Sequence, residues 1–179
     1  MNKYLFTLAL IITSSIGRAQ SISVEQSTNG IQIGILGAWV YNESKLTNQL
    51  ALRTEFGLVN GIWGGSFYEK NGHIMFSKIT VEPRLYYNLN KRNEKSKRID
   101  GNSGNFISLK TNYYPKWVIS SNYDHISIAE NLNLIPTWGI RRSISNHLNF
   151  EFSFGIGYEY ITEKNYTSNR SDITADLNL

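Results

Sequence analysis

Cysteine is absent from the 179 residues of this chain. Its absence excludes disulfide bonds, thiolate chemistry and the lipid-anchored class of secreted proteins, whose anchor is attached to a cysteine. Long apolar runs are absent as well, since no stretch after residue 19 approaches the roughly 18 consecutive apolar residues of a membrane-spanning helix. The mean hydropathy of −0.31 is that of a water-soluble protein, but alternating strands lower this average even in membrane barrels.

The chain has a small net charge and few histidines. The chain has 18 Lys and Arg against 14 Asp and Glu, a formal net charge of +4, and without Lys3 and Arg18 the balance is 16 against 14, or +2. So small a charge argues against nucleic acid as a partner. The three histidines, His73, His125 and His147, have neither i, i+4 nor His-x-His spacing, so no metal site is expected. No glycine cluster leads from a strand into a helix, so no cofactor is expected.

The N-terminus has the features of a secretory signal peptide. Lys3 supplies a positive charge, residues 4–12 (YLFTLALII) form a short apolar core, and small residues precede a cleavage site before Gln20. The alternative is a buried N-terminal helix. The expected organisation is a signal peptide over residues 1–19 and one mature domain over residues 20–179.

The clearest pattern in the chain is the segment 148–160, LNFEFSFGIGYEY, in which large apolar residues alternate with small, polar or charged ones. A period of two over thirteen residues predicts a strand with two unlike faces. The segment exceeds both the five or six residues of an ordinary strand and the roughly 9–11 residues of a transmembrane strand. An apolar face opposite a charged face is typical of a membrane barrel.

The same alternation recurs in residues 31–39, 50–58, 79–89, 107–113, 132–141 and 173–179. Because such barrels have an even number of strands, with eight at the small end, an eighth strand is expected in residues 61–68 or 21–25. Pro83 and Pro136 fall inside two of the patterns, and each predicts a bulge. The predicted fold is all-β, an antiparallel up-and-down transmembrane β-barrel of about eight strands.

The connections between the predicted strands have two lengths. Short turns are expected at 42–48 and 143–146, and long polar connections at 62–73, 116–130 and 162–172. Membrane barrels place short turns on the periplasmic side and long loops outside, so the three long connections are expected outside. Residues 90–105 fall on the side of the short turns despite their length.

Six segments together support a family resemblance: GIQIGILGAWVYNE, ALRTEFGL, ITVEPRLYYNLNKR, NFISLKTNYYP, IPTWGIRR and FSFGIGYEY. They resemble the small outer-membrane β-barrel proteins of the Bacteroidota type, an uncharacterised family with an architecture like that of the outer membrane protein X and A class. The resemblance covers most of the mature chain and implies an outer-membrane barrel without catalytic residues. Such barrels usually end on an aromatic residue that the insertion machinery reads. This chain ends on Asp176-Leu177-Asn178-Leu179, which predicts a last strand shortened by a few residues.

Charged residues occupy the face of the strands that is predicted to point inward. They are Arg53, Glu55, Glu82, Arg84, Lys110, Arg141, Glu151, Glu159 and Asp176. One interpretation is a polar lumen that selects ions, or paired carboxylates for acid–base chemistry. The favoured interpretation is a structural network of ion pairs, because eight strands enclose only enough room for side chains and unpaired buried charges are costly.

Aromatic residues occupy the opposite face, which is predicted to point outward: Trp39, Tyr87, Tyr113, Trp138, Tyr158 and Tyr160. They are expected to form an interfacial aromatic girdle. The alternative is the core of a soluble, lipocalin-like barrel with its apolar face inward. A Phe-rich strand of thirteen residues fits that alternative less well.

Two further clusters admit a functional interpretation. The basic run at 91–98 is expected to be a solvated loop, with contact to anionic lipid headgroups or lipopolysaccharide phosphates as the alternative. Asp124, His125 and Ser127 contain the residue types of a hydrolase triad, but three neighbours in one loop have poor geometry for one.

The sequence therefore predicts an integral outer-membrane β-barrel with a polar interior filled by side chains and with external loops. Its expected role is structural or binding at the cell envelope, without enzymatic activity. The expected partners are outer-membrane lipid, lipopolysaccharide and the barrel-assembly machinery, and the protein is expected to be a monomer. The alternatives are a soluble secreted or periplasmic barrel that binds a hydrophobic ligand, and an outer-membrane lipid-modifying enzyme.

Overall fold

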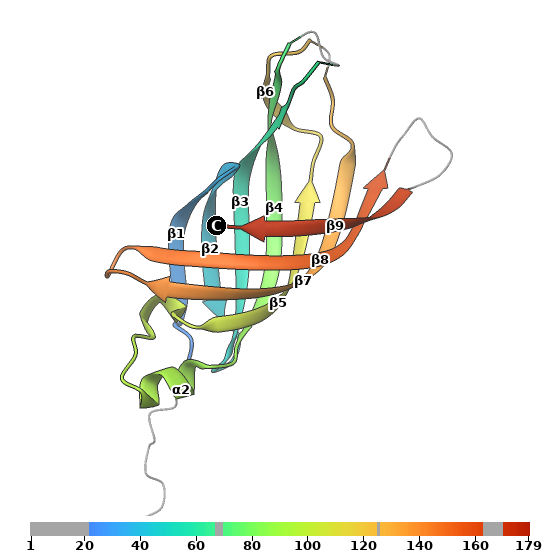
Figure 1. Ribbon diagram of the computed structural model, residues 1–179. Coiled ribbons are helices and arrows are strands. Elements are labelled where there is room, and N and C mark those ends of the chain that lie inside the picture. Colours follow the sequence, from blue (N-terminus) through green and yellow to red (C-terminus); the bar gives the residue numbers. More distant parts are fainter. Residues whose placement is uncertain (1–21, 67–69, 125, 163–169) are drawn as a thin grey trace, which may run out of the picture.

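The computed structural model describes residues 22–66, 70–124, 126–162 and 170–179 and consists mainly of one antiparallel sheet (Figure 1). Its strands are β1 (Ser27–Gly34), β2 (Gly37–Lys45), β3 (Leu50–Trp63), β4 (Gly72–Tyr86), β5 (Asn105–Tyr114), β6 (Val118–Ser121), β7 (Glu130–Ser143), β8 (Asn149–Thr162) and β9 (Arg170–Asn178). Eight strands follow the order β1-β2-β3-β4-β5-β7-β8-β9, and β6 pairs with β4. The predicted all-β, antiparallel, up-and-down arrangement is confirmed. The predicted signal peptide lies outside the described residues.

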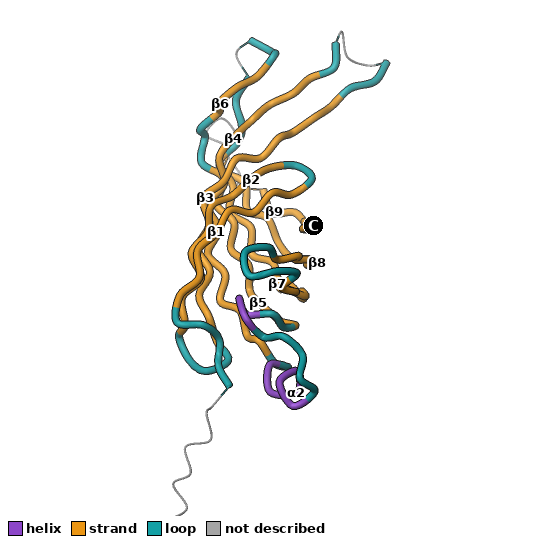
Figure 2. The backbone as a smooth tube through the Cα atoms, turned by 90° about the vertical axis from the view of Figure 1, so that its left-hand side faces the viewer, coloured by secondary structure: helices purple, strands orange, loops and turns teal. Residues whose placement is uncertain are grey.

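The sheet is strongly rolled. β2 and β7 are four strand spacings apart along the sheet, which is about 19 Å if the sheet were flat. Nevertheless, the Arg141 guanidinium on β7 lies 3.2 Å from the Glu43 carboxylate on β2. Figure 2 shows the two walls that result, with β1–β4 on one side and β7–β9 on the other. Side chains from distant strands therefore meet on the concave face.

The first hairpin corrects two predictions. β1 and β2 pair from Ser27–Ser44 to Gly34–Gly37 around a two-residue turn, Ile35-Leu36. Residues 31–39 therefore contain parts of two strands rather than one, and β2 is the strand that the alternation left unassigned. The sequence predicts the eighth strand in residues 61–68 or 21–25. The described residues of these ranges do not provide it, because β3 continues to Trp63 and residues 22–25 form no strand.

The upper part of the sheet extends as a three-stranded projection. β3 and β4 stay paired as far as Trp63–Gly72, and β6 pairs with β4 beyond the end of β5 (Figure 1). The predicted long connection 62–73 is therefore shorter than expected, and part of 116–130 is strand. Tyr123 fixes the projection, since its ring lies 5.6 Å from that of Trp63 and its hydroxyl donates to the Lys70 carbonyl at 2.7 Å.

The two strand prolines do not form the predicted bulges. The β4–β5 register is the same on both sides of Pro83, with Val81 opposite Thr111 and Arg84 opposite Ser108. The β7–β8 register is likewise unchanged across Pro136. Each proline interrupts the ladder on one side only, where its missing N–H would have been donated. The strands continue without an extra residue.

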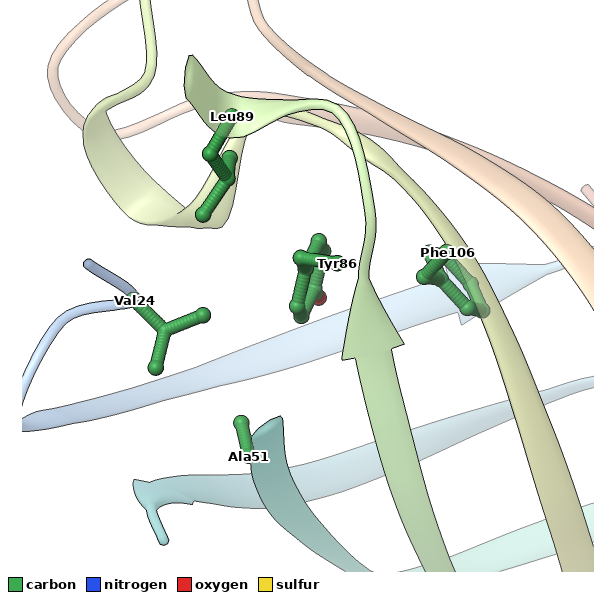
Figure 3. Packing of buried hydrophobic residues seen from close by; sticks show 5 residues of the cluster. All are labelled: Val24, Ala51, Tyr86, Leu89 and Phe106. Carbon is green, nitrogen blue, oxygen red and sulfur yellow. The ribbon is translucent and has the colours of Figure 1, made fainter. Parts of the chain in front are cut away.

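A small hydrophobic plug closes the lower end of the rolled sheet. The β4–β5 connection contains helix α2 (Leu89–Glu94) and the short 3-10 helix η1 (Asp100–Asn102). Figure 3 shows the buried residues that gather between α2 and the strand ends: Val24, Ala51, Tyr86, Leu89 and Phe106. The length of the predicted 90–105 connection thus has a structural cause, because it covers the end of the sheet.

Leu89 provides a direct test of this plug. Replacing the buried Leu89 by alanine should lower the free energy of unfolding by about 2–4 kcal/mol, because it leaves a cavity under α2. Leu46 is half exposed in the β2–β3 turn, and Leu46→Ala should change stability by less than about 0.5 kcal/mol. Urea unfolding followed by tryptophan fluorescence measures both. Equal effects of the two substitutions would show that α2 does not seal the lower end.

Candidate functional site

The concave face holds a network of buried charges, and Arg84 on β4 has the most direct contacts. Its Nη1 and Nη2 donate to the two carboxylate oxygens of Glu151 on β8 at 2.9 and 2.8 Å. Nη2 also donates to Glu82 at 2.8 Å. Arg84 and Glu82 are two residues apart on β4, so their side chains lie on the same face of the strand, which is the inner one. The bidentate contact joins strands that are not neighbours in the sheet.

Two more arginines surround the same carboxylates. Arg53 on β3 donates to Glu55 and lies 3.7 Å from both Glu43 and Glu151. Arg141 on β7 donates to Glu43 at 3.2 Å. Glu43 and Glu151 are therefore each within 4 Å of all three guanidinium groups. This arrangement offsets the cost of burying each charge.

Neutral groups complete the network. Tyr86 donates its hydroxyl hydrogen to Glu43 at 2.9 Å, and Asn102 from η1 donates to the same carboxylate oxygen. The Tyr41 hydroxyl accepts from Arg141 at 2.6 Å, and Gln32 accepts from Arg53. Sequence reasoning missed these four residues together with Glu43. Glu43 and Tyr41 follow the unrecognised turn at 35–36, and that turn was the signal that could have found them.

A second group of charges lies nearer the projection. Lys110 on β5 donates to Asp176 on β9 at 2.7 Å. Lys78 on β4 places its ammonium 4.7 Å from the centre of the Trp39 ring. With Lys78 and Glu43 included, five cations face five anions: Arg53, Lys78, Arg84, Lys110 and Arg141 against Glu43, Glu55, Glu82, Glu151 and Asp176. The charges of these ten residues are balanced.

The structure places the predicted interior charges as follows. Arg53, Glu55, Glu82, Arg84, Lys110, Arg141 and Glu151 are buried on the concave face, and Asp176 is partly buried beside Lys110. Glu159 lies opposite Asn133 in the register and is half buried, and among the described residues it joins none of these ion pairs. The chemistry available here is mutual neutralisation of charges and cross-strand hydrogen bonding.

Trp39 lies where the sequence did not predict it. The residue is expected on the outer face, but it is 8% exposed and packs against Lys78 and Gly57 on the inner face. The two-residue turn is the cause, because it pairs Trp39 with the inward Gln32 rather than continuing the alternation of β1. A methyl group on Gly57 would lie 1.9 Å from the indole ring, so glycine is required there.

The other five predicted girdle residues lie on the convex face at two levels. At the lower level, Trp138 donates its indole hydrogen to the Tyr87 hydroxyl at 2.9 Å. At the upper level, Tyr113 and Tyr160 flank Leu132 in one cross-strand row, with Tyr158 close by. Exposed aliphatic residues such as Leu109 (42%), Leu134 (48%) and Ile156 (66%) lie between the two levels.

A hollow of about 740 Å³ opens between β1 and the β7–β8 turn. Its walls are residues 27–33 of β1, Leu148 of the β7–β8 turn and residues 149–151 of β8, and its floor includes Arg53 and Arg141. β9 pairs with β8 only from Ser153 upward, so the lower part of β8 borders this hollow. The hollow is the seam between the two ends of the sheet.

The remaining candidate residues do not converge. His125 lies outside the described residues, while Asp124 and Ser127 are exposed in the β6–β7 connection. His73 and His147 are exposed at opposite ends of the sheet. No group of three or more His, Cys, Asp or Glu side chains suited to a metal ion occurs in the described part of the chain. None of the helices described here is long and apolar enough to cross a membrane.

Comparisons with protein-family models, with curated proteins and with solved structures found no match to this chain.

Removing Arg84 tests whether the network is structural. Arg84→Met should lower the free energy of unfolding by about 3–5 kcal/mol, because it leaves Glu82 and Glu151 buried without their closest cation. Lys95→Met removes the same charge from an exposed position on the lower cap and should cost less than about 0.5 kcal/mol. Urea unfolding of both variants decides the matter. A loss for Arg84→Met no greater than that for Lys95→Met would mean that the carboxylates do not depend on this arginine.

Proposed function

We propose that this protein is an integral outer-membrane β-barrel with a closed, charge-filled interior and a structural or binding role at the cell envelope. The observation that carries the proposal is the inverted distribution of polarity. Arginine, lysine and glutamate side chains are buried inside, whereas isoleucine, leucine and phenylalanine side chains cover the outside. A water-soluble monomer does not expose a continuous apolar surface of this extent.

The dimensions of the outer apolar band support the proposal. Tyr87 and Ile140 mark its lower row and Tyr113 and Leu132 its upper row, eight residues apart along β7. Eight residues span about 27 Å along a strand. At the strand tilt of membrane barrels this becomes roughly 20 Å, close to the apolar band of about 25 Å in such proteins.

The approach of the two sheet edges supports closure into a barrel. β1 and β9 end the strand order without a hydrogen-bonded pairing between them in the described residues. However, the Leu179 carbonyl lies so close to Gly34 that a methyl group on Gly34 would be 3.2 Å from it. In a bilayer, unpaired backbone groups at strand edges are costly, which favours closing this seam.

The orientation follows from the connections. The three-stranded projection and the described part of the connection between β5 and β7 lie at one end. The short β2–β3 and β7–β8 turns lie at the other, together with the α2 cap. Loop length in membrane barrels places the projection outside the cell and the cap in the periplasm.

Binding at the outer surface fits the projection better than transport or catalysis fits the interior. The hydrophobic plug covers the lower end and the ion pairs cross the interior from one wall to the other, which does not suit a pore. The projection carries the exposed residues Ile62, Trp117 and Ile119 on an internally hydrogen-bonded scaffold. We therefore infer that its external loops contact ligands or envelope components, with outer-membrane lipid and lipopolysaccharide around the barrel and the assembly machinery required for insertion.

The alternatives have less support. A soluble barrel for a hydrophobic ligand needs an apolar cavity, but the concave face carries buried charges instead. A lipid-modifying enzyme needs converging catalytic groups, but the described members of the Asp124–Ser127 cluster are exposed in one connection. The proposed role is therefore non-enzymatic.

Cell fractionation and heat-dependent gel mobility test the proposal. The protein should be found in the outer-membrane fraction and should migrate differently in SDS before and after boiling, because a closed barrel resists SDS until it is heated. A lipid-modifying activity would be visible as altered lipid products in the same cells. Recovery in the soluble periplasmic or secreted fraction, with no heat shift, would replace the proposal with the soluble-barrel alternative.

A matched pair of isoleucines tests whether the outer band faces lipid. Ile156 is 66% exposed midway between the two aromatic rows, and Ile62 is 72% exposed on the projection. Ile156→Arg should destabilise the refolded protein in lipid vesicles by about 2–4 kcal/mol, whereas Ile62→Arg should be nearly neutral. Heat-dependent mobility after refolding measures both. In water the two sites are equivalent, so equal effects would contradict a lipid-facing band.

A further inference from the structure

The lower edge of the outer band contains an arginine that its surroundings do not explain. Arg142 follows the inward Arg141 on β7, so its side chain lies on the convex face, two residues below Ile140. Its Nη1 donates to the Arg141 carbonyl at 2.7 Å and its Nη2 to the Asn105 side-chain oxygen at 2.5 Å. No carboxylate pairs with it in the described part of the chain. Arg142 is partly exposed, so its charge is accessible to an anion from outside the chain.

A second arginine approaches from the α2 cap. Arg92 donates from Nη2 to the Arg98 carbonyl at 2.7 Å and to the Ser103 hydroxyl at 3.3 Å. That hydroxyl donates in turn to the Arg141 carbonyl at 3.4 Å, the same carbonyl that Arg142 contacts. Partial burial lowers the pKa of Arg92 from its ordinary value, but a guanidinium remains charged at neutral pH. Arg142 and Arg92 are therefore linked at the Arg141 carbonyl, Arg142 directly and Arg92 through the Ser103 hydroxyl.

The two aromatic residues at the lower level of the outer face, Tyr87 and Trp138, belong to the same hydrogen-bonded group. Asn105, which accepts from Arg142, donates to the Tyr87 hydroxyl at 3.3 Å. The same hydroxyl accepts from the Trp138 indole at 2.9 Å. We call the five residues Tyr87, Arg92, Asn105, Trp138 and Arg142 the basic rim. It contains two cations, two interfacial aromatic side chains and no acidic residue.

We propose that the basic rim binds the phosphate group of an anionic phospholipid, with Arg92 and Arg142 on the phosphate and Tyr87 and Trp138 beside the glycerol and upper acyl region. The planar guanidinium fork matches phosphate oxygens. Tyrosine and tryptophan favour the depth at which headgroup and hydrocarbon meet. The proposal rests on the proposed function, because only a lipid-facing band places Arg142 at headgroup level.

The position of the basic rim in the proposed orientation indicates which class of lipid it binds. The basic rim lies at the end of the α2 cap, which loop length assigns to the periplasmic side. The leaflet on that side consists of glycerophospholipids, whereas lipopolysaccharide belongs to the outer leaflet. The ligand is therefore an anionic glycerophospholipid, for which phosphatidylglycerol is the probe.

Quenching of tryptophan fluorescence by brominated lipid tests the proposal with the full chain. The protein is refolded into phosphatidylcholine vesicles that contain either dibrominated phosphatidylglycerol or dibrominated phosphatidylcholine, and Trp138→Phe identifies the signal of Trp138. Wild type should prefer phosphatidylglycerol roughly fivefold, the equivalent of about 1 kcal/mol. Arg92→Gln/Arg142→Gln should reduce the preference to about one. Arg92→Gln alone, a change on the cap outside the sheet, should reduce it at least twofold if the double variant fails to refold.

The matched control is Lys95→Gln/Lys97→Gln, which removes two exposed charges from the same connection but leaves the basic rim intact. It should keep the preference of wild type. If this control loses the preference for phosphatidylglycerol to the same extent, the preference comes from general surface charge, and the proposal is wrong. If millimolar inorganic phosphate abolishes the preference for phosphatidylglycerol, the basic rim binds free phosphate rather than a lipid headgroup, and the proposal is wrong. Absence of any quenching by brominated phosphatidylcholine would instead contradict membrane insertion, and so separates failure of the proposed function from failure of this inference.

Discussion

The structure depends on the neutralisation of buried charge by side chains from strands that are not neighbours. Glu43 and Glu151 are each surrounded by the same three arginines, which come from β3, β4 and β7. Arg84 on β4 contacts Glu151 on β8, and Arg141 on β7 contacts Glu43 on β2, so these contacts across the interior form only when the sheet rolls. The ion pairs therefore specify curvature and register as well as contributing stability, a role that a purely apolar core does not require.

The rest of the architecture follows from the burial of charged side chains on the concave face of the sheet. The outward faces are left to apolar residues, so the protein exposes a surface that water disfavours and hydrocarbon accepts. The ends of the roll must then be closed against water. At the lower end, α2 and η1 close it with the hydrophobic plug, and η1 also supplies Asn102 to Glu43. At the upper end the sheet continues as the hydrogen-bonded projection.

Sequence reasoning succeeded where a strand showed its alternation over many residues. The segment 148–160 falls within β8 except for its first residue, and the nine predicted interior charges are all buried or partly buried, eight of them in ion pairs. It failed at Ile35-Leu36, where two exposed apolar residues form a turn without the Asn-Gly or Gly-containing centre that marks most tight hairpins. That single miss merged β1 with β2, reversed Trp39 and hid Glu43. Contacts such as Arg84 with Glu151 were not predictable, because they depend on how far the sheet rolls.

The two arginines of β7 show how one strand can serve two environments. Arg141 and Arg142 are neighbours in sequence, but the alternation of the strand sends the first into the interior and the second to the outer face. Arg141 contacts Glu43 among the buried carboxylates, whereas Arg142 has only neutral acceptors and is linked to Arg92 through the Arg141 carbonyl and Ser103. A protein that neutralises each interior arginine so completely, and yet leaves two together at its lower edge, satisfies that charge most simply with an anion from outside the chain. In the proposed outer-membrane location, the lipid headgroups would be the nearest source of such an anion.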